Sequence, residues 1–107
     1  MMQFLLTIFL AIAAAQPRVV EISAKKFAFT PDSITLKRGE TVTIRVTSQD
    51  RDHGFLQKDL GIDLDVEPDR VNEVTITPET AGRYLAICDD FCGSGHGNMK
   101  MTIDVVD

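Results

Sequence analysis

The segment from residue 88 to residue 99, CDDFCGSGHGNM, gathers side chains that bind soft metal ions. It holds both cysteines of the chain, Cys88 and Cys92, together with His96 and Met99. Thiolate, imidazole and thioether groups suit copper, above all Cu(I), far better than calcium or magnesium. A methionine ligand also argues against structural zinc, whose sites use cysteine, histidine and carboxylate. The spacing Cys-x3-Cys-x3-His-x2-Met therefore indicates a copper site in one loop.

A metal centre on this loop needs another nitrogen ligand, and the only other histidine of the chain is His53, in QDRDHGFLQ. It follows a predicted strand that ends near Thr47, so we expect it on a loop. In a β-sandwich that loop can lie at the same end as residues 88–99. A mononuclear blue-copper site needs one cysteine, two histidines and a weak axial methionine. The second cysteine allows two thiolates to bridge two metal ions instead.

Each of these residues has an ordinary structural interpretation when it is taken alone. Two cysteines in an exported protein most often form a disulfide, which would join Cys88 to Cys92. Met99 would be a core residue of the last strand, and His53 would be a surface or turn histidine. The copper interpretation rests on all these ligand types occurring together at these spacings.

The rest of the chain must position the loop, and its apolar residues alternate with a period of two, which predicts short strands separated by turns. The expected strands are 19–23, 33–36, 41–47, 61–66, 72–77, 83–88 and 99–106. We interpret residues 33–47 as a hairpin that turns at Lys37–Glu40. No segment of the sequence has a helical period, so we predict an all-β sandwich or barrel.

The chain begins with MMQFLLTIFLAIAAAQP, an uncharged apolar run that ends in three alanines. This pattern is typical of a signal peptide cleaved after Ala15. The run is shorter than the ~20 apolar residues that span a bilayer; the alternative is an uncleaved membrane anchor. We therefore expect residues 1–15 to be a signal peptide and residues 16–107 to be one domain that is periplasmic or exported.

The chain carries 11 Lys and Arg against 16 Asp and Glu, a net charge of −5. It has no cluster of basic residues, which argues against nucleic acid as a partner. Residues 50–69 are rich in Asp and Glu and form either a solvated face or a docking patch for a basic partner. Asp89 and Asp90 are adjacent and would not face one another as a catalytic pair, so we expect no catalytic turnover.

Taken together, these segments resemble the cupredoxins, and within them the CuA domain of cytochrome c oxidase subunit II and of nitrous-oxide reductase. The resemblance lies in DHGF, LGIDLDVEPDRVNEV and AGRYLAICDDFCGSGHGNM, and covers roughly the whole chain after residue 15. It implies a cupredoxin-like Greek-key β-sandwich or barrel. It also implies an electron carrier with a dinuclear CuA centre of two copper ions.

The resemblance assigns a role to each candidate ligand. The implied metal ligands are His53, Cys88, Asp90, Cys92, His96 and Met99. The two cysteine sulfurs would bridge the coppers, and each histidine would bind one copper. The methionine would be a weak axial ligand to one copper, and the aspartate would offer its backbone carbonyl to the other. The family usually has glutamate there, which in oxidases also reaches a magnesium site. Phe55 and Phe91 would belong either to the apolar shell of the centre or to the ordinary core.

The chain also departs from these families. It has no tryptophan, whereas oxidase subunit II carries a Trp-containing aromatic stretch that helps pass electrons to the centre. It has one apolar segment where oxidase subunit II has transmembrane helices, and it lacks the propeller domain of nitrous-oxide reductase. We therefore expect a stand-alone domain.

Four functions are compatible with these residues. The first is electron transfer with a redox partner such as a c-type cytochrome or a copper oxidase or reductase. The second is periplasmic copper binding or delivery by the same ligands. The third is a metal-free interaction module with a disulfide, and the fourth is an accessory subunit of a terminal oxidase.

Overall fold

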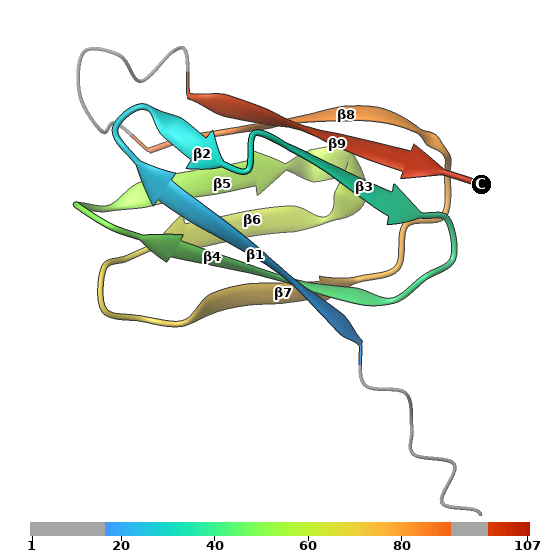
Figure 1. Ribbon diagram of the computed structural model, residues 1–107, viewed down its shortest axis with the longest axis horizontal. Coiled ribbons are helices and arrows are strands. Elements are labelled where there is room, and N and C mark those ends of the chain that lie inside the picture. The colour runs from blue at the N-terminus through green and yellow to red at the C-terminus, as the bar shows by residue number, and fades with distance from the viewer. Residues whose placement is uncertain (1–16, 91–98) are drawn as a thin grey trace, which may run out of the picture.

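The computed structural model describes residues 17–90 and 99–107, and within them the chain forms nine strands and one short 3-10 helix (Figure 1). The strands are β1 (Arg18–Lys25), β2 (Ala28–Thr30), β3 (Ser33–Lys37), β4 (Val42–Ser48), β5 (His53–Gln57), β6 (Ile62–Val66), β7 (Asn72–Ile76), β8 (Gly82–Ile87) and β9 (Lys100–Val106). The helix, η1, covers Lys58–Leu60. The all-β prediction is confirmed.

The strands form two sheets that pack face to face. One sheet has the order β2-β1-β4-β7, and the other has the order β3-β9-β8-β5-β6. Two pairs, β1 with β4 and β3 with β9, are parallel, and the other pairs are antiparallel. Because neighbours in each sheet are often distant in sequence, the chain crosses repeatedly between the sheets. This mixed order brings β5 and β8, the strands that lead into the candidate site, next to each other.

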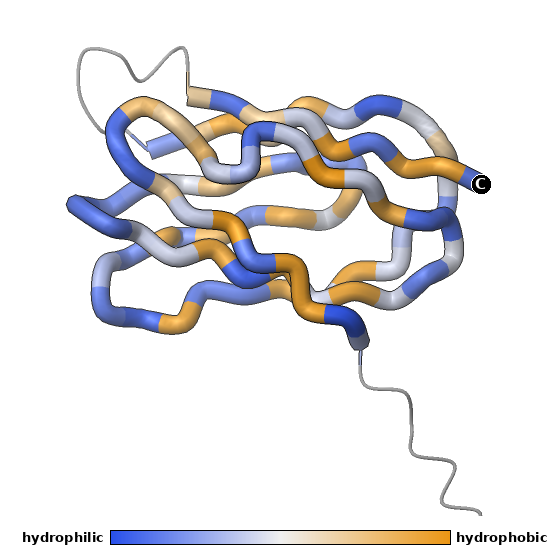
Figure 2. Tube along the Cα trace, in the orientation of Figure 1, coloured by the Kyte–Doolittle hydropathy of each residue, from blue (hydrophilic) through white to orange (hydrophobic). Residues whose placement is uncertain are grey.

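The core lies between the sheets and is built from the alternation seen in the sequence. In β4, Val42, Ile44 and Val46 are fully buried, while the residues between them are partly exposed. Figure 2 shows the same change between hydrophobic and hydrophilic residues along the strands. Burying one such aliphatic side chain contributes about 1.5–3 kcal/mol. Phe55 meets Phe29 edge to face, with ring centroids 5.2 Å apart, so it is a core residue two positions after His53.

The predicted hairpin over residues 33–47 is wrong. Both strands exist, but β3 pairs with β9, and β4 lies between β1 and β7 in the opposite sheet. The turn between them crosses from one sheet to the other. Its backbone is hydrogen-bonded to the end of β9 and to the segment that follows β7. The N–H of Arg38 donates to the carbonyl of Val106, and the N–H of Gly39 donates to that of Pro78. A glycine turn between two alternating runs looks the same locally whether or not the flanking strands pair.

The prediction that His53 lies on a loop is also wrong. His53 is the first residue of β5, a strand that the sequence analysis missed, and it pairs with Val66 of β6. The segment HGFLQ has three consecutive buried positions, so it lacks the alternation by which the other strands were predicted. No helix among residues 17–90 and 99–107 has the length and apolar character needed to cross a membrane.

Candidate metal centre

The structure describes four of the six predicted ligands, and they come from β5 and from the two ends of the 88–99 loop. The four are His53, Cys88, Asp90 and Met99. The other two, Cys92 and His96, lie outside the described residues, as do Phe91 and the predicted signal peptide. The bridging arrangement, the alternative disulfide and the cleavage site therefore stay predictions.

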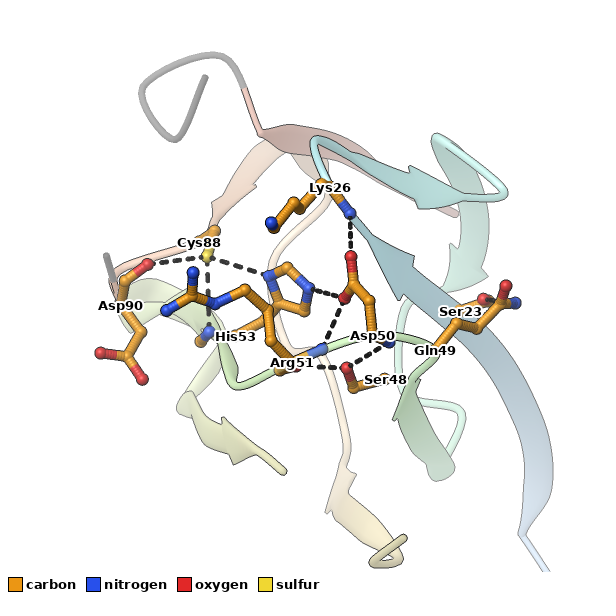
Figure 3. A network of polar contacts seen from close by, with 10 residues as sticks. Ser23, Lys26, Ser48, Gln49, Asp50, Arg51, His53, Cys88 and Asp90 are labelled. Carbon is orange, nitrogen blue, oxygen red and sulfur yellow. Dashed lines mark hydrogen bonds and ion pairs between the residues drawn. The ribbon is translucent and has the colours of Figure 1, made fainter. Parts of the chain in front are cut away.

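His53 and Cys88 are brought together although they are 35 residues apart in sequence. The Nδ1 atom of the His53 ring lies 4.0 Å from the sulfur of Cys88 (Figure 3). Both side chains are buried, with exposed fractions of 0% and 3%. The antiparallel pairing of β5 with β8 places them side by side, since Leu56 is opposite Ile87 and both ligands lie further toward the same end. The expectation that these two residues lie at the same end of the sandwich is confirmed.

The sulfur of Cys88 has two further polar neighbours. The backbone N–H of Gly54 donates to it at 3.4 Å, and its thiol donates to the backbone carbonyl of Asp90 at 3.2 Å. Figure 3 shows this carbonyl turned toward the sulfur while the carboxylate of Asp90 points away. The N–H of Cys88 donates to the carbonyl of Met99 at 3.0 Å, which joins the two ends of the loop. Carbonyl oxygen, thiol and imidazole thus converge on one buried point.

Asp50 holds the other side of the His53 ring. Its Oδ1 lies 2.6 Å from Nε2 of His53, and its two oxygens accept the backbone N–H groups of Lys26 and Arg51. Partial burial raises the pKa of Asp50, but these hydrogen bonds outweigh it and lower the pKa to about 2. A charged carboxylate only accepts hydrogen bonds, so Nε2–H of His53 donates to Asp50, and Nδ1 is the ring nitrogen that faces Cys88.

The carboxyl group of Asp89 lies against Gly54, whose N–H donates to the sulfur of Cys88. Burial raises its pKa, and the nearby carboxylates of Asp63, Asp90 and Asp65 raise it further, against a hydrogen bond to its own backbone that lowers it. Negative charge is therefore concentrated beside the candidate ligands. Sequence analysis gave no role to Gly54 or Asp89, because their contact is set by the strand pairing and by no local pattern. It also gave no role to Asp50, although this carboxylate is only three residues before His53 and that short spacing was a local signal.

The described residues fit copper in the chemistry of their donors. An imidazole nitrogen, a thiol sulfur and a carbonyl oxygen meet here, and Met99, at the other end of the loop, is 1% exposed. Soft and borderline donors of this kind select copper. Across residues 17–90 and 99–107, no three His, Cys, Asp or Glu side chains gather into a metal-binding group. A complete site therefore needs donors from residues 91–98.

Comparison with protein families places this arrangement in a known group. The family model described as cupredoxin-like domain matches residues 1–103. Cytochrome c oxidase subunit 2 of Thermus thermophilus is 36% identical over 86 residues, which are 80% of this chain and 64% of that protein. A probable cytochrome c oxidase subunit 2 of Rickettsia prowazekii is 31% identical over 87 residues, 81% of this chain and 28% of that protein. The chain thus spans less than two thirds of the length of these relatives.

Solved structures share the fold. The periplasmic domain of cytochrome oxidase subunit II (CoxB) of Bradyrhizobium japonicum superposes with a TM-score of 0.77 at 19% identity, over 84% of each chain. A chain of a heme-copper terminal oxidase dimer gives a TM-score of 0.76 at 28% identity, over 85% of this chain and 66% of that one. The blue copper protein auracyanin A of Chloroflexus aurantiacus gives 0.68 at 21% identity, over 84% and 99%. The predicted cupredoxin-like fold is confirmed.

Proposed function

Because the chain belongs to the cupredoxin-like domain family, we propose that it is a copper-binding electron-transfer protein with a dinuclear CuA-type centre. One observation carries this proposal: the Nδ1 atom of His53 faces the buried sulfur of Cys88 at 4.0 Å. The proposed ligands are His53, Cys88, Asp90, Cys92, His96 and Met99. The two cysteine thiolates bridge the two ions, and when bound the centre supplies a one-electron redox couple.

The chain's own contribution is to hold these donors still. Electron carriers change redox state with little movement, and His53 and Cys88 are fixed at the ends of two paired strands. Asp50 keeps the proton on Nε2 of His53, so that Nδ1 stays available as a donor. The buried setting keeps water away from the sulfur. We propose that the chain itself is no enzyme, and that any catalytic turnover belongs to a partner.

The surface beside Cys88 is suited to bind a redox partner with a basic rim, such as a c-type cytochrome. Leu85 and Ile87 point outward from β8 and are 50% and 40% exposed, and Ile87 directly precedes Cys88. Asp63 of β6 is opposite Leu56 of β5, which is itself opposite Ile87, so carboxylate and apolar side chains share this face. Small apolar contacts with complementary charge suit the short-lived encounters of electron transfer.

A second candidate is an accessory subunit of a terminal oxidase, favoured by the similarity to cytochrome c oxidase subunit 2. A third is periplasmic copper delivery by the same donors, which needs no dinuclear centre. We propose a periplasmic or exported location after cleavage of residues 1–15, or a membrane-anchored form if they are retained. The periplasmic domain of CoxB among the similar structures supports this location.

The proposal is tested by loading the reduced protein with copper and measuring metal content and spectra on one sample. We expect two coppers per chain that share one unpaired electron in the electron paramagnetic resonance spectrum. The variant Cys92→Ser should lose this spectrum. One copper per chain with a blue or colourless spectrum would instead indicate a mononuclear carrier or a delivery protein. Protein that retains no copper would reject all of the copper functions.

A further inference from the structure

Gly54 lies against Asp89, and a larger residue at position 54 would require Asp89 to move. A Cβ atom built on Gly54 would lie 1.8 Å from Oδ1 of Asp89, 2.9 Å from its Cγ and 3.1 Å from its backbone nitrogen. The Asp89 carboxyl group therefore occupies the volume that an alanine methyl would need. The contact also reaches the backbone of Asp89, so turning the side chain alone relieves only part of the crowding.

Glycine is favoured at position 54 because a side chain there would crowd Asp89. Its backbone angles are not unusual. In the described part of the chain, the glycines with positive φ are Gly39, Gly61 and Gly82. Gly54 is not among them, so an alanine could adopt its backbone conformation. Close approach of another segment is the remaining physical reason for a glycine in a strand.

The segments that meet here both carry proposed ligands. Gly54 follows His53, and Asp89 lies between Cys88 and Asp90. The N–H of Gly54 donates to the sulfur of Cys88 at 3.4 Å, a bond that requires the two segments to approach closely. In the antiparallel pair β5–β8, Leu56 is opposite Ile87. Gly54 and Asp89 lie two residues further along each segment, toward the proposed ligands.

We propose that Gly54 and Asp89 are positioning residues that set the approach of the His53 segment to the Cys88 segment. The carboxyl group packs into the space above Gly54, which keeps the Gly54 N–H on the sulfur and shields that sulfur from water. The contact acts through its size, so it does not depend on the charge of Asp89. This inference rests on the proposed function for its copper readout, but its geometric part holds in the metal-free protein.

Four variants separate this role from a merely structural one. Gly54→Ala introduces the clash, and Asp89→Ala empties the space above Gly54. The double variant Gly54→Ala/Asp89→Ala removes the clash that the first variant creates. Asp89→Asn keeps the size and removes the charge, and Asp52→Ala is a matched control at an exposed aspartate beside His53. Far-ultraviolet circular dichroism of each metal-free variant checks that it folds.

In copper-loaded protein, we expect Gly54→Ala to weaken copper affinity by roughly 10–100-fold, the range for residues that orient metal ligands. Its reduction potential and sulfur-to-copper absorption should shift as well. The double variant should recover most of the affinity, Asp89→Asn should lose far less affinity than Gly54→Ala, and Asp52→Ala should match the wild type. Wild-type affinity and potential in Gly54→Ala, or a double variant no better than Gly54→Ala, would overturn the proposal.

A metal-free measurement keeps the test independent of copper and of whether Gly54→Ala folds. In the Cys92→Ser background Cys88 is the one thiol, and its reaction with an aromatic disulfide reagent reports access to its sulfur. We expect Asp89→Ala to react severalfold faster than the background, and Asp89→Asn to react at the background rate. Equal rates for Asp89→Ala and the background would reject the positioning role. If Asp89→Ala reacts faster than the background but the wild-type chain binds no copper, the proposed function is rejected and the positioning role stands.

Discussion

The Nε2 atom of His53 lies 2.6 Å from Oδ1 of Asp50, and this contact decides which ring nitrogen faces the sulfur of Cys88. The backbone N–H groups of Lys26 and Arg51 hold the carboxylate in place, so the ring is oriented from two neighbouring loops (Figure 3). A histidine ligand is commonly held in this way by a carboxylate on its second nitrogen. The protein's own contacts therefore fix the orientation of the His53 ring.

Replacing Asp50 by alanine should weaken copper binding by about 10–100-fold, because the ring of His53 loses the group that fixes its proton and its orientation. Competition with a Cu(I) chelator of known affinity measures this loss. Asp52→Ala is the matched control, since Asp52 is exposed and one residue from His53. If both variants lose the same copper affinity, the loss comes from removing a negative charge near the site. It would then not come from a change in the orientation of the His53 ring.

The acid stability of the metal-free protein should depend on Asp50. Its pKa is lowered in the fold from 3.8 to about 2, so the folded state holds the charged form more strongly than the unfolded chain does. This stabilisation is fully present above the unfolded pKa and is lost as the pH falls through the folded pKa. Urea unfolding between about pH 5 and pH 2 should show a smaller acid loss in Asp50→Asn than in the wild type. Parallel curves for the two proteins would contradict the prediction.

Met99 and Met101 form a matched pair for testing the axial ligand. Both are 1% exposed, but only Met99 is a proposed ligand. Leucine at either position should lower the free energy of unfolding by less than about 1.5 kcal/mol, since the volume is nearly conserved. Met99→Leu should also shift the reduction potential, because the axial ligand of a copper–thiolate site tunes that potential. A shift of the same size in Met101→Leu would assign the effect to core packing.

The carboxylates of β6 should speed association with a basic redox partner. Asp63→Asn/Asp65→Asn removes two charges beside the apolar residues of β8, whereas Glu21→Gln/Glu73→Gln removes two from the other sheet, where both glutamates pair with Arg45. With a basic c-type cytochrome at low salt, the first variant should associate about tenfold more slowly than the second. Stopped-flow rates over a series of ionic strengths measure this difference. Equal salt dependence in both variants would place the docking surface elsewhere.

Local sequence patterns were sufficient for the class of fold and for the kind of chemistry. Alternation marked the inner face of β4, and Val42, Ile44 and Val46 are all fully buried. The donor types in CDDFCGSGHGNM were sufficient to indicate copper, because affinity for a soft ion depends on the atoms offered. These properties belong to single residues and near neighbours, so they can be read without the fold.

The partners of each strand and each ligand were decided by the tertiary structure. A turn at Gly39 does not specify whether the next strand returns to the same sheet, and it crosses to the other one. The pairing of β5 with β8 brings His53 to Cys88, and it also gives Gly54 a role that no spacing indicates. Such contacts join residues far apart in sequence. They follow from how the whole core packs, because no short segment contains the residues that form them.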